Sequence, residues 1–317
     1  MQTILHNCCG LDVHKDSIYA CILKTVNHSD DNRKKEETEK EIRVFETFPD
    51  DLKELREWLE SKDCRHVAME STGIYWYPIY DVLETAFEGN MEILVVNARH
   101  MRNVPGKKTD VKDCEWIAQL LRAGLLNGSF IPPMQVRELR QQTRYRKNIV
   151  QDICTQKNRI EKTLQIGGIK LSTFLTDIFG VSGRNLMNVL IKKGCLTPED
   201  VETETRCISK EKKAEIKRAV NGRLTMVQRN FLKSQLSHLD EIYAHLTEVE
   251  ESIAELSEPL HDDIERLDTI PGIADTAAKA IIAEVGTDMS KFPTAEHFCS
   301  WAGLAPGSNM SAGKKKL

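Results

Sequence analysis

The chain has 317 residues, of which 40% are hydrophobic and 29% charged, a composition typical of a soluble globular protein rather than a disordered or fibrous one. Its length is enough for about two domains, and no apolar run approaches the ~20 residues that a membrane-spanning helix needs. Forty-four Lys and Arg against 48 Asp and Glu give a net charge of -4, which by itself argues against a nucleic-acid-binding protein.

The first third of the chain alternates strand and helix patterns. We predict strands at 7–13, 17–23, 41–48, 66–69 and 92–96. Residues 27–40 are strongly charged and are interpreted as a flexible or inserted loop. We predict helices at 50–61, with Asp50 as N-cap, and at 75–87 and 110–121. Three consecutive strands followed by alternating helices and strands predict a mixed α/β sheet with an antiparallel hairpin and helices on its faces.

After Pro132-Pro133 the pattern becomes all-α. A long basic helix is predicted over Val136 to Leu164 and is broken by Gly167-Gly168; residues 170–222 read as short helices of unassigned fold. A second long helix carries an apolar residue every seven positions from Leu232 to Leu267, which is typical of a coiled coil, and Pro259 must end or kink it. This stripe predicts either a hairpin with the first long helix or a dimer zipper, and the two remain open.

Charge is unevenly distributed along the chain. Residues 99–170 hold fifteen Lys or Arg against six Asp or Glu, a net charge of about +9. Residues 235–268 hold eleven Asp or Glu against one Arg, a net charge of about -10. The near-zero total therefore conceals a basic stretch that can meet phosphates.

Nine cysteines are scattered without any C-x-x-C pair. This spacing argues against a zinc site and a disulfide framework, and favours a reducing compartment. The N-terminal residues lack the basic segment and long apolar core of a signal peptide. We therefore expect a cytoplasmic protein without a membrane partner.

Four acidic residues stand where strand ends and a helix can converge. Asp12 ends the first strand, Glu70 follows a later one, and Asp110 and Asp113 lie three residues apart on one helix face. Such a cluster needs cations, and carboxylates are suitable ligands for Mg²⁺ or Mn²⁺ in phosphoryl transfer. His14, two residues after Asp12, is interpreted as a surface histidine rather than a phosphate contact.

The C-terminal part carries two further motifs. Residues 267–286 place the turn IPGI between two short helices, which indicates a helix-hairpin-helix in which Gly272 lets the backbone approach a phosphate. The chain then ends in a glycine-rich basic segment in which Ser311 precedes Lys314, Lys315 and Lys316. Cationic neighbours of this kind can stabilise a phosphate or a serine alkoxide.

Together and in this order, these segments resemble the transposases of the insertion-sequence-110 type, also described as bridge-RNA-guided recombinases. The resemblance covers most of the chain and rests on GLDVHKDS with Asp12, AMESTGIYWYPI with Glu70, KKTDVKDCEWIAQLL with Asp110 and Asp113, and EVGTDMSKFPTAEHFCSWAGLAPG followed by SAGK with Ser311. It implies a RuvC-like DEDD domain of the RNase H fold at 1–130, a coiled-coil helical region at 131–262, and a transposase domain with the helix-hairpin-helix at 263–317.

The resemblance also implies a mechanism. Asp12, Glu70, Asp110 and Asp113 would hold Mg²⁺ (or Mn²⁺), and a serine would form a covalent link to DNA, with both halves of the site usually joined between subunits of a dimer or tetramer. A structured non-coding guide (bridge) RNA would pair with donor and target DNA. The serine motif here reads Met-Ser-Ala-Gly-Lys, so we place the nucleophile on Ser311 rather than Ser308. Because members continue beyond this motif, we expect a C-terminally truncated, nucleoid-associated prokaryotic member.

Basic residues supply candidate nucleic-acid contacts. Arg99, Arg102, Lys107 and Lys108 precede the aspartate pair, where a DNA backbone needs counter-charge. The guide RNA is expected along one basic helix, on the residues Arg137, Arg140, Arg144, Arg146 and Lys147. Gly272 and Lys314 are two further candidate nucleic-acid contacts.

Three rival functions remain. A RuvC-type or RNase H-type nuclease, such as a Holliday-junction resolvase, would use the four acids and metal-activated water without Ser311. An actin-like ATPase or sugar kinase would need a second glycine-rich phosphate hairpin, which is not evident. A non-enzymatic helix-hairpin-helix DNA-binding protein would not need Asp12.

Overall fold

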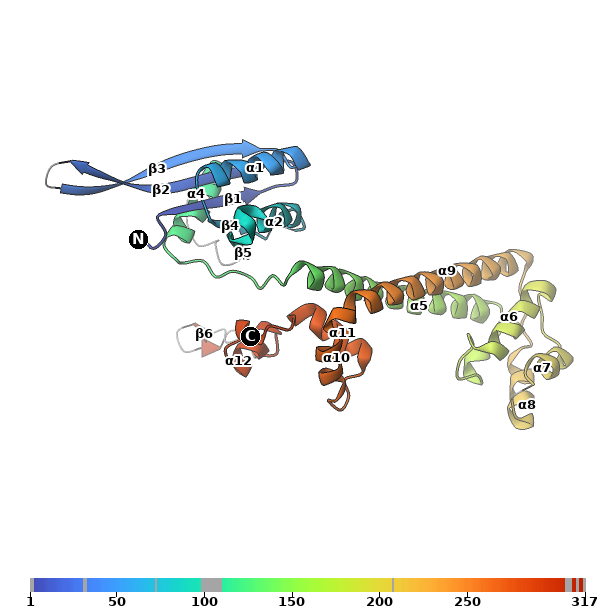
Figure 1. Cartoon of the computed structure of the whole chain (residues 1–317). Helices are drawn as coiled ribbons and strands as arrows, with labels where there is room; N and C mark the ends of the chain where they lie inside the picture. The colour runs from blue at the N-terminus through green and yellow to red at the C-terminus, as the bar shows by residue number, and fades with distance from the viewer. Residues whose placement is uncertain are drawn as a thin grey trace. The chain divides into compact units, whose positions relative to one another are not determined.

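The computed structural model describes residues 3–30, 33–71, 73–97, 110–206, 208–305, 310–311 and 314–315. The chain divides into two compact units, Met1–Ile131 and Pro132–Leu317 (Figure 1). The first unit is built around a β-sheet and the second is mainly helical. No helix within the described ranges is long and apolar enough to cross a lipid bilayer.

The sheet of the first unit has five strands in the order β3-β2-β1-β4-β5. They are β1 (Asn7–Val13), β2 (Ile18–Asp30), β3 (Arg33–Phe45), β4 (His66–Glu70) and β5 (Glu92–Val96). β1 pairs antiparallel with β2, and β2 with β3, whereas β4 runs parallel to both β1 and β5. The prediction of a mixed sheet with an antiparallel hairpin is therefore confirmed.

Helices cover both faces of this sheet (Figure 1). α1 (Pro49–Ser61) and α2 (Trp76–Glu84), followed by the short 3-10 helix η1 (Ala86–Gly89), share one apolar core with alternate residues of β1 and β4. α4 (Asp110–Arg122) packs on the opposite face. The predicted N-cap of α1 was wrong: Phe48 occupies that position, because Pro49, whose ring presets a helical φ, takes the first helical position.

The charged segment 27–40 is not the loop that the sequence predicted. β2 and β3 remain paired from Ile18↔Phe45 out to Asp30↔Arg33, with Asn27 opposite Glu36, so both strands form one long ribbon beyond the edge of the sheet. An antiparallel ladder uses backbone N–H and C=O groups, so charged side chains do not prevent it. Charge composition misled the interpretation because it reports on solvation and not on backbone pairing.

Two long helices organise the second unit: α5 (Met134–Ile166) and α9 (Met226–Ser257). The apolar faces of the two helices form one core. In it, Leu232, Leu239 and Ile253 of α9 are buried together with Ile153 and Ile160 of α5. Polar contacts join them too, since Gln156 Nε2 donates to the Gln235 carbonyl at 3.0 Å and Arg146 lies 2.7 Å from Glu250. Of the two arrangements left open, the intramolecular hairpin is the one that this structure shows.

Shorter helices complete this unit. Residues 170–222 form η2 (Leu171–Thr173), α6 (Val181–Lys193), α7 (Pro198–Glu204) and α8 (Lys210–Ala219), as the short-helix prediction required. α9 ends at Ser257, two residues before Pro259, also as predicted. The remaining elements are η3 (Glu258–Leu260), α10 (His261–Asp268), α11 (Asp275–Val285), η4 (Met289–Lys291), α12 (Ala295–Trp301), β6 (Met310–Ser311) and β7 (Lys314–Lys315).

Candidate functional site

The end of β1 presents Asp12 toward α4. Side chains alternate along a strand, and Leu11 and Val13 belong to the core beneath α1 and α2. Asp12 therefore shares the opposite face with Gly10. A Cβ on Gly10 would overlap the Cys114 carbonyl oxygen and the Ala118 amide nitrogen of α4. The glycine thus lets the α4 backbone lie directly on β1, which brings the first turn of α4 beside Asp12.

Glu70 reaches the same face from the neighbouring strand. β1 and β4 are parallel, with Leu11 opposite Met69, so Asp12 and Glu70 are the next positions along. Ala68, two residues before Glu70, packs in the core beneath α4. By the two-residue period of a strand, Glu70 lies on the α4 face, where it is half-buried. Register therefore places the ends of β1 and β4 beside each other.

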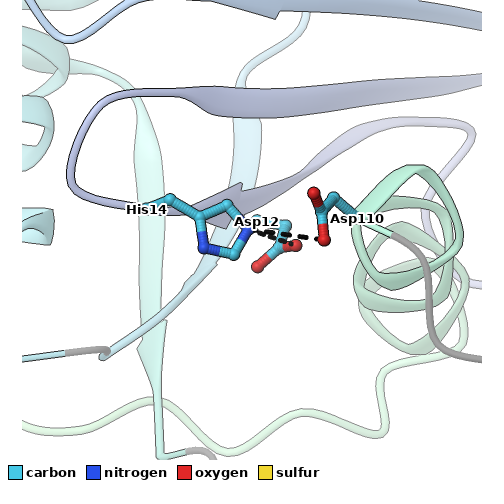
Figure 2. Close-up of side chains that lie close together, drawn as sticks. All are labelled: Asp12, His14 and Asp110. Carbon is cyan, nitrogen blue, oxygen red and sulfur yellow. Dashed lines mark hydrogen bonds and ion pairs between the residues drawn. The ribbon is translucent and has the colours of Figure 1, made fainter.

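The His14 ring faces two of the carboxylates, those of Asp12 and Asp110 (Figure 2). Its Nε2 lies 3.2 Å from Asp12 Oδ2 and 3.7 Å from Asp110 Oδ1. One ligand atom from each of these residues falls within 4.8 Å of the others. Sequence interpretation assigned His14 to the surface, and its side chain is indeed 45% exposed. His14 follows β1 directly, only two residues after Asp12, and this short spacing is the signal in the sequence for their proximity.

Electrostatics at this point favours a cation. Burial is the main cause that raises the pKa of the Asp12 carboxyl, and the charges of Asp113 and Asp110 act in the same direction, while His14 opposes them. The charge of Asp113 therefore acts on the Asp12 carboxyl. Within the described chain, however, the group of ligand atoms close enough to share one ion includes neither Asp113 nor Glu70. Carboxylate oxygens with one imidazole nitrogen fit a divalent metal ion.

The five predicted basic residues of α5 do not share one role. Arg140 donates from Nε to the Ala283 carbonyl at 2.9 Å and from Nη2 to the Glu284 carbonyl at 2.8 Å. Arg144 makes a bidentate pair with the Glu284 carboxylate at 2.7 and 2.8 Å. Both cations thus hold the C-terminal end of α11, whose last carbonyls lack helical partners. Arg137 donates to the Pro132 carbonyl at 3.0 Å.

A cleft of about 1300 Å³ in the second unit is lined by residues of α5, α9 and α11. Gly272 lines it, at a φ of 94° and with open space where a Cβ would stand. The N-terminal residues of α11, 274–277, also face this cleft. Its charged lining residues are Arg144, Arg146, Lys147, Lys279, Glu250, Asp275 and Glu284. Three of the lining cations pair with the three lining carboxylates, as Arg144 with Glu284, Arg146 with Glu250 and Lys279 with Asp275. The N–H groups of the first turn of α11 and the Lys147 ammonium are groups that can bind phosphate oxygens.

Two of the remaining predicted residues, Ser311 and Lys314, lie in described strands. Ser311 and Lys314 are backbone register partners in the two-stranded ribbon β6–β7. Arg99, Arg102, Lys107 and Lys108 lie outside the described residues.

Comparisons with known proteins agree on one family. Residues 9–167 match the DEDD transposase model of the IS110 type, described as a transposase, and residues 264–317 match the model described as Transposase IS116/IS110/IS902 family. None of the curated proteins compared with the chain matches it. Among solved structures, RuvC of Thermus thermophilus is similar at 10% identity over 39% of this chain and 99% of that one, with a TM-score of 0.29.

A second structure, T. thermophilus RuvC in complex with a Holliday junction substrate, matches at 11% identity over 39% of this chain and all of that one, with a TM-score of 0.27.

The first family model spans half of the chain and runs from β1 to the end of α5. The mixed-sheet topology and the element order confirm the predicted fold class of an α/β unit followed by a helical region. The chain belongs to the IS110 family of transposases.

Proposed function

We propose that this chain is an RNA-guided DNA recombinase that joins donor and target DNA through a serine–DNA covalent intermediate, assisted by Mg²⁺ (or Mn²⁺). The observation that carries the proposal is the convergence of Asp12 and Asp110 at the end of β1, in a chain of a transposase family. Asp12, Glu70, Asp110 and Asp113 are the proposed metal ligands. A bound divalent ion would stabilise negative charge on phosphodiester oxygens.

Asp12 and Asp110 have different proposed roles because their side chains differ in exposure. Asp12 is only 7% exposed, so it is a fixed and poorly solvated ligand at the base of the site. The Asp110 side chain is 50% exposed, so it can meet a DNA phosphate and an ion together. A buried anion beside further carboxylates is costly without a cation, and this cost supports metal binding here.

Ser311 is the proposed nucleophile. Its hydroxyl oxygen would bond to a DNA phosphorus, the bond between that phosphorus and one sugar oxygen would break, and the freed sugar oxygen would take up a proton. The serine proton would pass to a base or to water. Attack by the sugar hydroxyl of a second strand would reverse these steps and release the serine. Support comes from the family match over 264–317 and from Lys314, the backbone register partner of Ser311.

Replacing Ser311 by Ala should abolish the covalent protein–DNA adduct. A denaturing gel with end-labelled DNA is expected to show the adduct with the unaltered chain and with the matched control Ser308→Ala, and none with Ser311→Ala. A RuvC-type nuclease would instead give free cleaved DNA that persists in Ser311→Ala, since metal-activated water needs no serine. An adduct that survives the substitution would exclude Ser311 as the nucleophile.

Guide RNA binding is proposed for the cleft lined by α5, α9 and α11. Arg140 and Arg144 already hold α11, whereas Lys147 is exposed on α5 and lines the cleft. Replacing Lys147 by Glu should weaken binding of the co-purifying RNA and reduce the slope of log affinity against log salt by about one to two. Lys162→Glu, which alters an exposed residue of α5 that does not line the cleft, is the matched control. Unchanged RNA affinity in Lys147→Glu would contradict this placement.

The same proposal includes the organisation of the protein. We assign 1–130 to the catalytic RuvC-like domain, 131–262 to the helical connection and 263–317 to the transposase domain with its helix-hairpin-helix. Asp12 and Ser311 belong to different compact units, and we propose that a dimer or tetramer assembles both parts of the site. Action in the prokaryotic cytoplasm fits scattered cysteines without metal or disulfide spacing.

A further inference from the structure

We propose that His14 is itself a ligand of the divalent ion, so that the centre contains one nitrogen donor and binds Mn²⁺ in preference to Mg²⁺. This inference rests on the metal site of the proposed function and adds a ligand that the four acidic residues do not include. His14 enters from the turn between β1 and β2, and its ring points at Asp12 and Asp110 (Figure 2).

The spacing suits shared coordination. Ligand atoms that lie about 2.0–2.2 Å from one ion are separated by about 3 Å when adjacent and by about 4.3 Å when opposite. His14 Nε2 lies 3.2 Å from Asp12 Oδ2 and 3.7 Å from Asp110 Oδ1, and all three atoms fall within 4.8 Å. Small side-chain rotations therefore bring the three atoms around one ion without moving the backbone.

The backbone of His14 and its ring each make a contact within the β1–β2 hairpin. The His14 backbone N–H donates to the Ser17 carbonyl at 2.9 Å, which closes the turn between β1 and β2. The ring also lies edge-on to Tyr19 of β2, with ring centroids 6.1 Å apart. A metal ligand gains affinity when its orientation is set in advance, and these two contacts favour the orientation in which the ring faces Asp12.

A nitrogen donor changes which ion the site prefers. Mg²⁺ favours oxygen ligands at near-octahedral geometry and dehydrates reluctantly. Imidazole suits transition metals, and Mn²⁺ binds more tightly than Mg²⁺ where a site offers nitrogen beside carboxylate oxygen. Loss of His14 should therefore weaken Mn²⁺ binding about tenfold or more, a size typical of damage to the surroundings of a metal site, and should change Mg²⁺ binding much less.

The rival interpretation is that His14 only donates a hydrogen bond to Asp12. His14→Gln separates the two, because a glutamine amide can still donate to the Asp12 carboxylate but has no imidazole nitrogen. His66→Gln is the matched control, since His66 is a histidine of β4 in the same sheet whose Nε2 lies 3.5 Å from Glu92.

The experiment is pulsed electron paramagnetic resonance on the full chain loaded with Mn²⁺, combined with Mn²⁺ and Mg²⁺ titrations. We expect modulation from directly bound ¹⁴N in the unaltered chain and in His66→Gln, and its loss in His14→Gln together with a fall of about tenfold or more in Mn²⁺ affinity. Bound Mn²⁺ without ¹⁴N modulation, or modulation that persists in His14→Gln, would overturn the His14 inference alone. A chain that binds no Mn²⁺ would overturn the metal site of the proposed function as well.

Discussion

Asp12→Asn is expected to slow DNA strand cleavage and joining by about a thousandfold. Asp12 is the most buried member of the acidic group at 7% exposure, and its carboxylate lies beside His14 and within the influence of Asp113 and Asp110. An amide keeps the shape but removes the negative charge that would attract a divalent ion. Turnover of labelled donor and target DNA measures the effect, with Asp16→Asn, an exposed position in the following turn, as control.

Stability measurements show whether a loss of activity in Asp12→Asn comes from the missing carboxylate or from unfolding. Burial raises the pKa of the Asp12 carboxyl in the folded chain. Ionisation therefore costs the folded state more than the unfolded state, so the wild-type carboxylate lowers stability above its folded pKa and has no effect below its unfolded pKa. In metal-free buffer the variant should be slightly more stable than the wild type at neutral pH, and the difference should vanish near pH 3.

Added Mn²⁺ or Mg²⁺ should reverse that order. Ions that bind only the folded chain raise its melting temperature, and the wild type has the carboxylate that binds them. Melting curves with and without each metal provide the measurement. A variant that is stably folded and retains full turnover would contradict a catalytic role for Asp12.

The second large effect is expected from Gly10→Ala. Its Cβ would overlap backbone atoms of Cys114 and Ala118, and backbone cannot move aside as a side-chain end can. We expect a loss of about 3 kcal/mol in the free energy of unfolding, the upper end of the usual cost of overpacking. Any folded fraction should hold α4 farther from β1, so Asp110 should leave the reach of Asp12 and Mn²⁺ affinity should fall.

Urea unfolding of the full chain measures the first effect and Mn²⁺ titration the second. Gly128→Ala is the matched control in the same unit, because a Cβ there meets the end of the Leu94 side chain, which can rotate. Its cost should stay near 1 kcal/mol. Equal stability of Gly10→Ala and the wild type would show that close packing of α4 on β1 does not build the site.

Much of the first unit was predictable because its signals are local. The strands Asn7–Val13 and Glu92–Val96 were predicted with their observed bounds, since short apolar runs between turn residues have few alternatives. The segment 27–40 was misread because backbone pairing with a neighbouring segment overrides composition. His14 was undervalued because the proximity of Asp110, nearly a hundred residues away, cannot be read from its neighbours in sequence.

Long-range contacts also decided the helical unit. The seven-residue spacing of apolar residues on α9 predicted that this face of the helix would be buried. Only the packing of Leu232 and Leu239 in one core with α5 identified the helix that buries it. Basic character along α5 was evident, but the sequence did not show that Arg140 and Arg144 bond to the C-terminal end of α11. The same guanidinium group can satisfy a carbonyl, a carboxylate or a phosphate, so sequence alone does not choose among them.

For this protein, the sequence by itself determined the order of strands and helices, the family resemblance and the acidic residues of the candidate site, because each depends on residue type and short-range period. Tertiary structure decided that Gly10 admits α4, that Asp12 and Glu70 share a face, and that His14 lies close to both Asp12 and Asp110. These are consequences of strand register and of close backbone approach. Both depend on which distant segments pack together, and that choice is made by the fold as a whole.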